Sequence, residues 1–321
     1  MSIGDLGEFG LIARVTARLP AGQHTLLGPG DDAAVVSAPD GRVVATTDLL
    51  VDGRHFRRDW STPYDIGRKA AAQNLADIAA MGAVPTSLLV GLAAPPDLAA
   101  FWAERFADGL RDECDLVEAG VVGGDVVRSD LLLIAVTALG DLQGREPVTR
   151  AGANVGDVVA FAGRLGWAAA GLATLSRGFR SPRVVVDAHR RPQPPYQAGP
   201  DAARSGATSM VDISDGLVAD LGHVARASAV QVNIRSSAFE IPDALSQVGS
   251  ALSIDPLTWV LRGGDDHALV ATFPAGATLP IGWHDIGSVV GGVVEADPGV
   301  VQGTVTVDGT PYPAGGFDHF A

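Results

Sequence analysis

Hydrophobic and polar positions in the first half of the chain switch between a helical period and a strand-like pattern. Residues 64–81 follow a Ser-Thr-Pro start signal, are rich in alanine and stop at a glycine, which predicts a helix that packs closely on its neighbour. Residues 42–51 are rich in valine and threonine and predict a strand. The same criteria predict a helix within 7–19, a helix at 97–114, strands at 116–122 and 131–139, and a turn at Gly123-Gly124-Asp125.

The second half repeats this alternation after a polar, glycine-containing stretch at residues 145–156, which is the best candidate for a domain junction. Strands are predicted at 157–162, 209–213 and 267–273, helices at 167–176 and 217–227, and a proline-rich surface connection at 177–200. A chain of 321 residues is long for one core. We therefore predict an α/β (α+β) protein with domains at residues 1–144 and 145–321.

The formal net charge of -14 predicts a surface that repels nucleic acid and anionic membranes and attracts divalent cations. Lys69 is the only lysine, which excludes the lysine-containing phosphate loop of many nucleotide-binding proteins. Cys114 is the only cysteine and fits a reducing compartment. The first residues lack the pattern of a signal peptide, so we predict a cytoplasmic protein.

Aspartates recur beside glycine, threonine or a strand end, and this pattern carries the candidate chemistry. Mg²⁺ prefers oxygen ligands and is usually held by scattered carboxylates shared with substrate phosphates. The predicted magnesium ligands are Asp32, Thr46, Thr47, Asp48, Asp77, Asp125, Asp212 and Asp215. Zinc is disfavoured by the single cysteine, and Ca²⁺ stays open although the chain contains no EF-hand loop.

Some of these positions have plainer interpretations. Taken alone, Asn74 and Asp77 favour a solvent-exposed helix face, since aspartate is mostly exposed. His55 is either a phosphate contact or an ordinary loop residue. The glycine turn before the helix at 217–227 predicts an anion site at the helix N-terminus. The second Gly-Gly-Asp, at residues 263–265, suggests a distant duplication of the first.

Five motifs taken together resemble the thiamine-monophosphate kinase family. They are Gly-Asp-Asp-Ala-Ala, Thr-Thr-Asp-Leu-Leu-Val-Asp-Gly-Arg-His-Phe, Asn-Leu-Ala-Asp-Ile-Ala-Ala-Met-Gly-Ala, Gly-Gly-Asp and Asp-Ile-Ser-Asp-Gly-Leu, and the likeness runs nearly end to end. The resemblance implies a two-domain fold like aminoimidazole ribonucleotide synthetase (PurM-like), a homodimer formed by the N-terminal domains, and ATP with several Mg²⁺ between the domains. It also implies transfer of the γ-phosphoryl group of ATP to thiamine monophosphate.

Position by position, the resemblance implies the same metal ligands and assigns further contacts. ATP contacts would be Gly124, Asp125, Arg150 and Ser214, and thiamine monophosphate contacts would be His55, Asp265 and Phe317. Two positions depart from the family pattern: Asp265-Asp266-His267 replaces Glu-Asp-Tyr, and Phe317 replaces a larger or hydroxylated aromatic residue. The alternatives are another ATP-dependent synthetase of this fold or a non-enzymatic nucleotide-binding paralogue.

Overall fold

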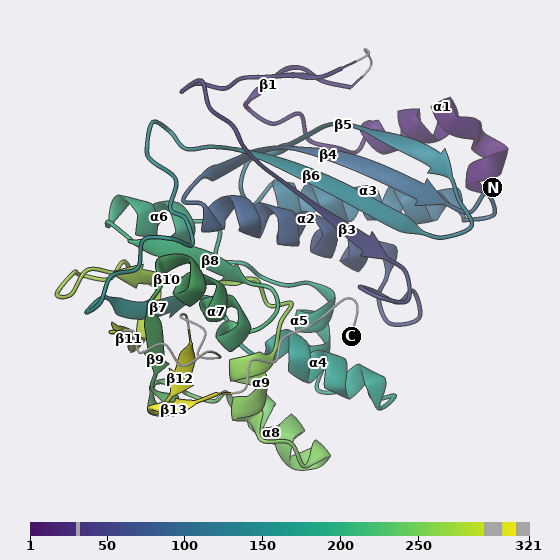
Figure 1. Ribbon diagram of the computed structural model, residues 1–321. Coiled ribbons are helices and arrows are strands. Elements are labelled where there is room, and N and C mark those ends of the chain that lie inside the picture. Colours follow the sequence, from purple (N-terminus) through teal and green to yellow (C-terminus); the bar gives the residue numbers. More distant parts are fainter. Residues whose placement is uncertain (30–32, 292–303, 313–321) are drawn as a thin grey trace, which may run out of the picture. The chain divides into compact units, whose positions relative to one another are not determined.

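The computed structural model describes residues 1–29, 33–291 and 304–312. Two predicted site residues, Asp32 and Phe317, lie outside the described residues. The chain forms two compact units, residues 1–78 with 83–144 and residues 79–82 with 145–321. Both units combine helices with sheets, which confirms the predicted α/β class (Figure 1).

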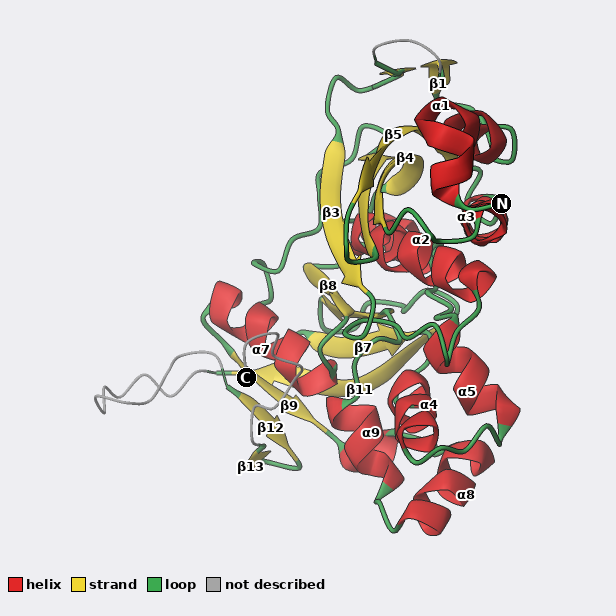
Figure 2. Ribbon diagram, turned by 90° about the vertical axis from the view of Figure 1, so that its right-hand side faces the viewer, coloured by secondary structure: helices red, strands yellow, loops and turns green. Residues whose placement is uncertain are grey.

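The first unit is built on a four-stranded sheet in the order β3-β6-β4-β5. Strands β4 and β5 are parallel and are joined through helix α3, whereas β6 runs antiparallel to both β3 and β4. Helices α2 and α3 lie on one face of this sheet (Figure 2). The elements are α1 Ile3–Thr16, β1 Thr25–Leu27, β2 Val35–Val36, β3 Val44–Val51, α2 Pro63–Ala80, β4 Val84–Ala94, α3 Ala100–Cys114, β5 Gly120–Arg128 and β6 Leu133–Asp141.

The second unit contains a seven-stranded sheet in the order β13-β12-β9-β11-β7-β10-β8. Helix α7 packs on β8, β9 and β12 and also contacts α9, which belongs to a group of helices formed by α4, α5, α8 and α9 (Figure 2). The elements are β7 Val158–Ala162, α4 Trp167–Ser176, α5 Arg183–Arg190, α6 Ala198–Arg204, β8 Ser209–Ile213, α7 Leu217–Ser228, β9 Gln231–Ile234, η1 Ser236–Ala238, α8 Asp243–Leu252, α9 Pro256–Arg262, β10 Ala268–Phe273, β11 Trp283–Val290, β12 Val305–Val307 and β13 Thr310–Pro311.

The predicted turn at Gly123-Gly124-Asp125 is wrong, because these residues lie inside β5 and pair with β4. A Cβ atom on Gly124 would lie 1.9 Å from the carbonyl oxygen of Val90. Glycine is therefore required by the close approach of the two strands rather than by a turn. The second Gly-Gly-Asp does form a turn, in which Asp265 has a φ of 70°, so the two motifs differ in conformation and the suggested duplication loses its support.

Residues 177–200 were predicted as a surface connection, but they contain helix α5 and the start of α6. Val185, Val186 and His189 of α5 are buried, and α5 packs against α4. The apolar run Val184-Val185-Val186 is short, and the prolines that follow it favour a connection rather than a helix. One face of α5 is thus part of the core of the second unit.

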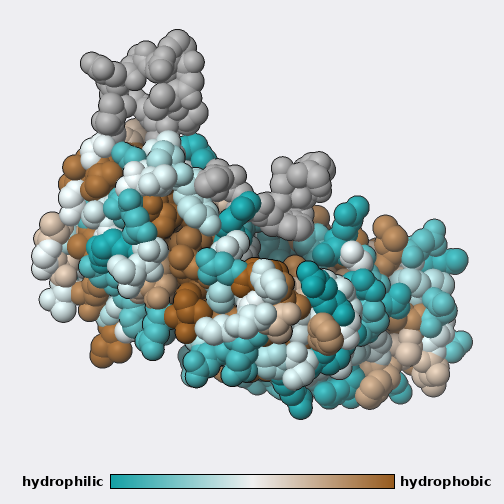
Figure 3. Space-filling view, turned by 90° about the horizontal axis from the view of Figure 1, so that it is seen from below, coloured by the Kyte–Doolittle hydropathy of each residue, from teal (hydrophilic) through white to brown (hydrophobic). Residues whose placement is uncertain are grey.

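On the face drawn in Figure 3, hydrophobic side chains occur in small groups separated by hydrophilic ones. Among the described residues, no helix combines the length and apolar character needed to cross a bilayer.

Candidate active site

The first cluster of polar residues lies where strand β3 packs on helix α2. Thr46 Oγ1 donates a 2.7 Å hydrogen bond to Asp77 Oδ2. Gln73 Nε2 donates to Asp48 Oδ2 at 3.0 Å, and Asn74 accepts the backbone N–H of Asp48 at 3.1 Å. The exposed face suggested for Asn74 and Asp77 is therefore wrong: Asn74 is fully buried, and both side chains hold strand β3.

Sheet register separates two other predicted ligands from this cluster. Asp48 pairs with Val136, whose side chain is buried under the helices. The next set of paired residues across the sheet runs from Leu49 through Ala135 and Gly91 to Asp125. Directly paired side chains point to the same face of a sheet, so Asp125 lies on the face opposite Asp48. Strands β3 and β5 are also the two edges of the sheet, about 14 Å apart at the usual strand spacing.

Thr47 shares the open face with Leu49 and Asp125. Its hydroxyl donates to the carbonyl of Val136 at 3.1 Å and accepts from Thr137 at 3.1 Å. Thr46 and Asp48 lie on the other face, because successive side chains of a strand alternate. Within one chain the structure thus groups Thr46, Asp48 and Asp77 and leaves Thr47 and Asp125 apart.

His55 lies in the turn that follows β3. Its Nδ1 accepts the backbone N–H of Val51 at 3.0 Å, so in the neutral ring the proton resides on Nε2. The imidazole is half-buried. This tautomer can donate one hydrogen bond to an anionic group, which is the contact that the resemblance implies.

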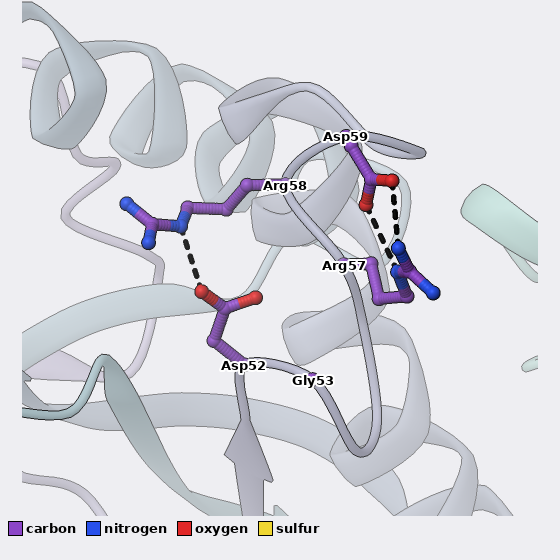
Figure 4. Close-up of a pocket in the computed structure, with 5 residues that line it drawn as sticks. All are labelled: Asp52, Gly53, Arg57, Arg58 and Asp59. Carbon is purple, nitrogen blue, oxygen red and sulfur yellow. Dashed lines mark hydrogen bonds and ion pairs between the residues drawn. The ribbon is translucent and has the colours of Figure 1, made fainter.

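The same turn borders an open pocket of about 650 Å³, lined by Asp52, Gly53, Arg57, Arg58 and Asp59 (Figure 4). Arg58 Nε donates to Asp52 Oδ2 at 2.7 Å. Arg57 donates to both carboxylate oxygens of Asp59, at 2.9 Å and 2.8 Å. Each guanidinium is therefore matched by a carboxylate, and the lining carries no excess charge.

The second unit holds the larger acidic cluster, at the ends of β8 and β10. β8 is fully buried and runs into the turn Ser214-Asp215-Gly216. The turn before β10 packs directly on it: Asp265 N–H donates to the Ser214 carbonyl at 2.8 Å, and a Cβ on Gly264 would lie 2.1 Å from that oxygen. The two glycine turns thereby bring Asp212, Asp215 and Asp265 into one neighbourhood.

His267 connects two of these carboxylates. Its Nδ1 lies 3.1 Å from Asp212 Oδ2, and its Nε2 lies 3.8 Å from Asp265 Oδ1. Burial opposes a charge on the ring, but hydrogen bonds and the charges of Asp212 and Asp265 outweigh it and raise the pKa of His267 to about 10. On the other side of Asp265, His189 Nδ1 of helix α5 lies 3.6 Å from Oδ2.

Asp220, in the first turns of α7, is a further buried member of the cluster. Its Oδ2 accepts the backbone N–H groups of Asp215 and Gly216, both at 3.0 Å. Burial and the charges of Asp212 and Asp215 raise its pKa to about 7, against the effect of the two amide bonds. Asp220 therefore takes the two amides at and just before the N-cap of α7, and the anion site at this helix N-terminus stays a prediction.

A neighbouring buried carboxyl, Asp266, belongs to a different helix start. Its Oδ1 accepts the backbone N–H of Ala168, in the first turn of α4, at 2.8 Å. Burial is the main cause that raises the pKa of Asp266 to about 7, and the charge of Arg164 only partly offsets it. Asp266 therefore caps α4. Among the described residues we observe no hydrogen bond between Asp266 and Asp212 or Asp215.

Helix α7 also approaches the predicted ATP contact Arg150. Ser228, at the end of α7, donates to the Arg150 carbonyl at 3.1 Å and accepts the N–H groups of Gly152 and Ala153. His223 lies nearer the middle of the helix, and burial together with the charges of Arg150 and Arg226 lowers its pKa. The ring is thus neutral near pH 7.

A divalent cation fits the donor chemistry of the second unit. Carboxylates outnumber the nearby cations, and Asp215, Asp220 and His223 offer ligand atoms that all lie within 4.8 Å of one another. Neighbouring carboxylates repel one another, and a bound cation relieves that repulsion. Sequence reasoning missed Asp220, His223 and His267, although the i,i+3 spacing of Asp220 and His223 in a predicted helix was a readable signal.

Comparison with known proteins agrees with the fold. Residues 30–142 match the family model described as AIR synthase related protein, N-terminal domain. The thiamine-monophosphate kinase of Mycobacterium tuberculosis is 49% identical over 292 residues, covering 91% of this chain and 87% of the relative. The enzyme of that name from Escherichia coli strain K12 is 35% identical and covers 98% of both chains.

A solved structure described as AaThiL complexed with AMPPCP and TMP superposes with a TM-score of 0.80 and 32% identity, covering 100% of this chain and 99% of that one. The first unit therefore has the AIR synthase related fold. Identity and coverage at this level establish more than the fold: the chain belongs to the thiamine-monophosphate kinase family. It is an enzyme of the phosphotransferase class.

Proposed function

We propose that this chain phosphorylates thiamine monophosphate with ATP and releases thiamine diphosphate and ADP. The observation that carries the proposal is the identity of 49% over nearly the whole chain to a thiamine-monophosphate kinase. The structure described with AMPPCP and TMP supports the same pair of substrates, because it aligns over the full length of this chain.

The chemistry explains why the cluster is rich in ligands and needs no strong base. An oxygen of the acceptor phosphate forms a bond to the γ-phosphorus, and the bond from that phosphorus to the β,γ-bridging oxygen breaks, so ADP leaves with the electron pair. The attacking oxygen is already ionised at neutral pH, so no proton must be removed. The main obstacle is the repulsion between two polyanions held in line.

Residues of this chain meet that obstacle by holding cations and by positioning. We propose that Asp212 and Asp215 of the second unit and Asp48 and Asp77 of the first hold Mg²⁺. When bound, Mg²⁺ neutralises phosphate charge and orients the transferred group. Arg150 supplies a fixed positive charge, and Ser228 orders the backbone that carries it.

For the acceptor we propose His55 Nε2 and Asp265 as contacts. His55 can donate to a phosphate oxygen, and the carboxylate of Asp265 suits the cationic ring of a thiamine. The shorter side chain of Asp265 is supported by His189 and His267 on its two sides. The roles of Asp32, Gly124, Asp125, Ser214 and Phe317, and an ATP site between the domains, stay predictions.

The test is ³¹P NMR of the purified chain with ATP, Mg²⁺ and thiamine monophosphate, beside a mixture without the thiamine compound. We expect thiamine diphosphate and ADP to grow together only in the complete mixture. ADP without thiamine diphosphate would contradict the acceptor and favour another ATP-dependent enzyme of this fold. No change in any signal would favour a nucleotide-binding paralogue.

We further propose a homodimer formed through the open face of the β3-β6-β4-β5 sheet. That face carries Leu49, Leu89 and Val127, which are 55%, 37% and 49% exposed. Exposed leucine and valine side chains gathered on one sheet face are typical of a protein interface. A second copy of this chain is the partner that the resemblance implies. We also propose a cytoplasmic location, which the buried, unpaired thiol of Cys114 supports.

A further inference from the structure

Helix α7 begins without a capping side chain of the usual kind. The residue at its N-cap position is Gly216, and no side-chain cap bond is made from that position. The first amides of a helix need partners when they are buried. Here Asp220, one turn further along, reaches back and accepts the N–H groups of Gly216 and Asp215 with a single oxygen.

The turn that these amides belong to carries the predicted metal ligands. Asp212 is the fourth residue of β8, three residues before Asp215, and both precede Gly216. Gly216 adopts φ 124° and ψ 147°, a conformation available almost only to glycine. A Cβ atom there would lie 2.6 Å from the carbonyl oxygen of Arg262, so the turn packs closely on the backbone at Arg262 and has no room for a side chain.

The turn is therefore held on two sides by different groups. The Ser214 carbonyl accepts the backbone N–H of Asp265. The N–H groups of the next two residues of the turn donate to the side chain of Asp220. Asp220 is 3% exposed, so water does not compete freely for these bonds. A buried carboxyl oxygen that accepts two backbone N–H groups fixes the direction of its donors.

We propose that Asp220 is a positioning residue for the cation site, which it serves by fixing the Ser214-Asp215-Gly216 turn. The proposal rests on the proposed function, in which Asp212 and Asp215 hold Mg²⁺. It has a second consequence: the amides of Asp215 and Gly216 are taken by Asp220, so phosphate is held at this helix start through the cation and not by these two N–H groups.

Two substitutions separate positioning from direct ligation. Asp220→Ala removes both hydrogen bonds. Asp220→Asn keeps an oxygen in the same place, which can accept both N–H groups, and removes the charge. Asp157→Ala is the matched control, because Asp157 is also buried and accepts the N–H of Asn154 and the hydroxyl of Thr208, at the opposite end of the sheet strands from Asp212.

The experiment measures binding of Mn²⁺ in place of Mg²⁺ by electron paramagnetic resonance, with and without a non-hydrolysable ATP analogue, on the full chain. Thermal unfolding is recorded for every variant. We expect Asp220→Ala to weaken Mn²⁺ binding by about tenfold to a hundredfold, the usual effect of losing a group that orients a metal ligand. Asp220→Asn should recover most of this loss, and Asp157→Ala should lower only the unfolding temperature.

Four outcomes would overturn the proposal. Equal loss in Asp220→Asn and Asp220→Ala would mean that the charge of Asp220, and not its hydrogen bonds, serves the cation. Wild-type Mn²⁺ binding in folded Asp220→Ala would reduce the residue to a structural cap. If Asp220→Ala does not fold, Asp220→Asn alone decides, since weak binding in that folded variant contradicts positioning. Absence of Mn²⁺ binding in the wild type would overturn the proposed function as well.

Discussion

His267 Nδ1 lies 3.1 Å from Asp212 Oδ2, and both side chains are more than nine-tenths buried. The two residues form a buried ion pair. Burial disfavours the charged imidazole, but hydrogen bonds to Asp212 and Asp265 and the charges of these two aspartates favour it. Removing one partner of a buried pair leaves the other charge without compensation, which costs more than the pair itself contributes.

We therefore expect His267→Gln to lower the free energy of unfolding by about 3 to 5 kcal/mol. Urea denaturation monitored by circular dichroism measures this change. The control is His284→Gln, because His284 is exposed on β11, and its substitution should cost about 0.5 kcal/mol or less. Equal losses in the two variants would contradict a stabilising His267 pair.

The buried carboxyl of Asp266 predicts a pH dependence with a defined sign. Its pKa is 3.8 in the unfolded chain and about 7 in the folded one. Between these values the folded state keeps a proton that the unfolded state releases. The contribution of Asp266 to stability therefore falls as the pH rises from about 4 to 7, by about 1 kcal/mol per pH unit, and is constant above 7.

Asp266→Asn removes this proton and can still accept the N–H of Ala168. The variant should gain stability relative to the wild type as the pH rises from 4 to 7, and the difference should level off above 7. Unfolding by guanidinium chloride at a series of pH values measures it. Parallel stability curves for the two proteins would show that Asp266 does not carry a raised pKa.

Gly124 should tolerate no side chain. A Cβ atom at this position would lie 1.9 Å from the Val90 carbonyl oxygen, so Gly124→Ala must displace strand β5 from β4. We expect a loss of about 1 to 3 kcal/mol or more in the free energy of unfolding. Gly123→Ala is the matched control, because its Cβ meets only the flexible end of Leu89 at 3.1 Å; a larger loss in the control would refute the close-approach explanation.

The two acidic clusters should each be necessary for turnover. Removing a residue that only orients a metal ligand usually lowers activity by about tenfold to a hundredfold. Asp48 and Asp215 are proposed as direct ligands, so we expect Asp48→Ala and Asp215→Ala each to reduce the rate by at least about a hundredfold. Circular dichroism should show folded protein in both. Asp115→Ala is the control, since this aspartate is exposed beyond the end of α3. Near wild-type rates in either cluster variant would refute the metal-site model.

The proposed dimer can be tested on the open sheet face. Leu49→Glu places a charge among the exposed apolar side chains of that face, and burying an unpaired charge in an interface is strongly unfavourable. We expect sedimentation equilibrium to shift from dimer toward monomer mass. Ile281→Glu, at a fully exposed position of the second unit, should leave the mass unchanged. A monomeric wild type, or a dimeric Leu49→Glu, would contradict this interface.

Local patterns were enough to predict about half of the elements of the fold. The start signals and alanine content of α2, the tryptophan-led helix α4 and the apolar strand β8 were predicted within a few residues of their observed bounds, because short-range geometry decides them. The same patterns failed at Gly123-Gly124-Asp125 and at α5. Glycine indicates both turns and close strand contacts, and proline-rich flanks hid a short helix.

What the sequence by itself determined was the set of carboxylates beside glycine and threonine, and the family they indicate. Only the tertiary structure decided which of them meet. Register sends Asp125 and Asp48 to opposite faces and edges of one sheet, while β8 and β10 bring Asp212 to His267 across 55 positions of sequence. Contacts of this kind depend on strand pairing and burial over long separations, which no local spacing contains. For the same reason the sequence shows Asp220 only as one residue of a predicted helix. The fold shows that its buried carboxyl group accepts two backbone N–H groups of the Ser214-Asp215-Gly216 turn.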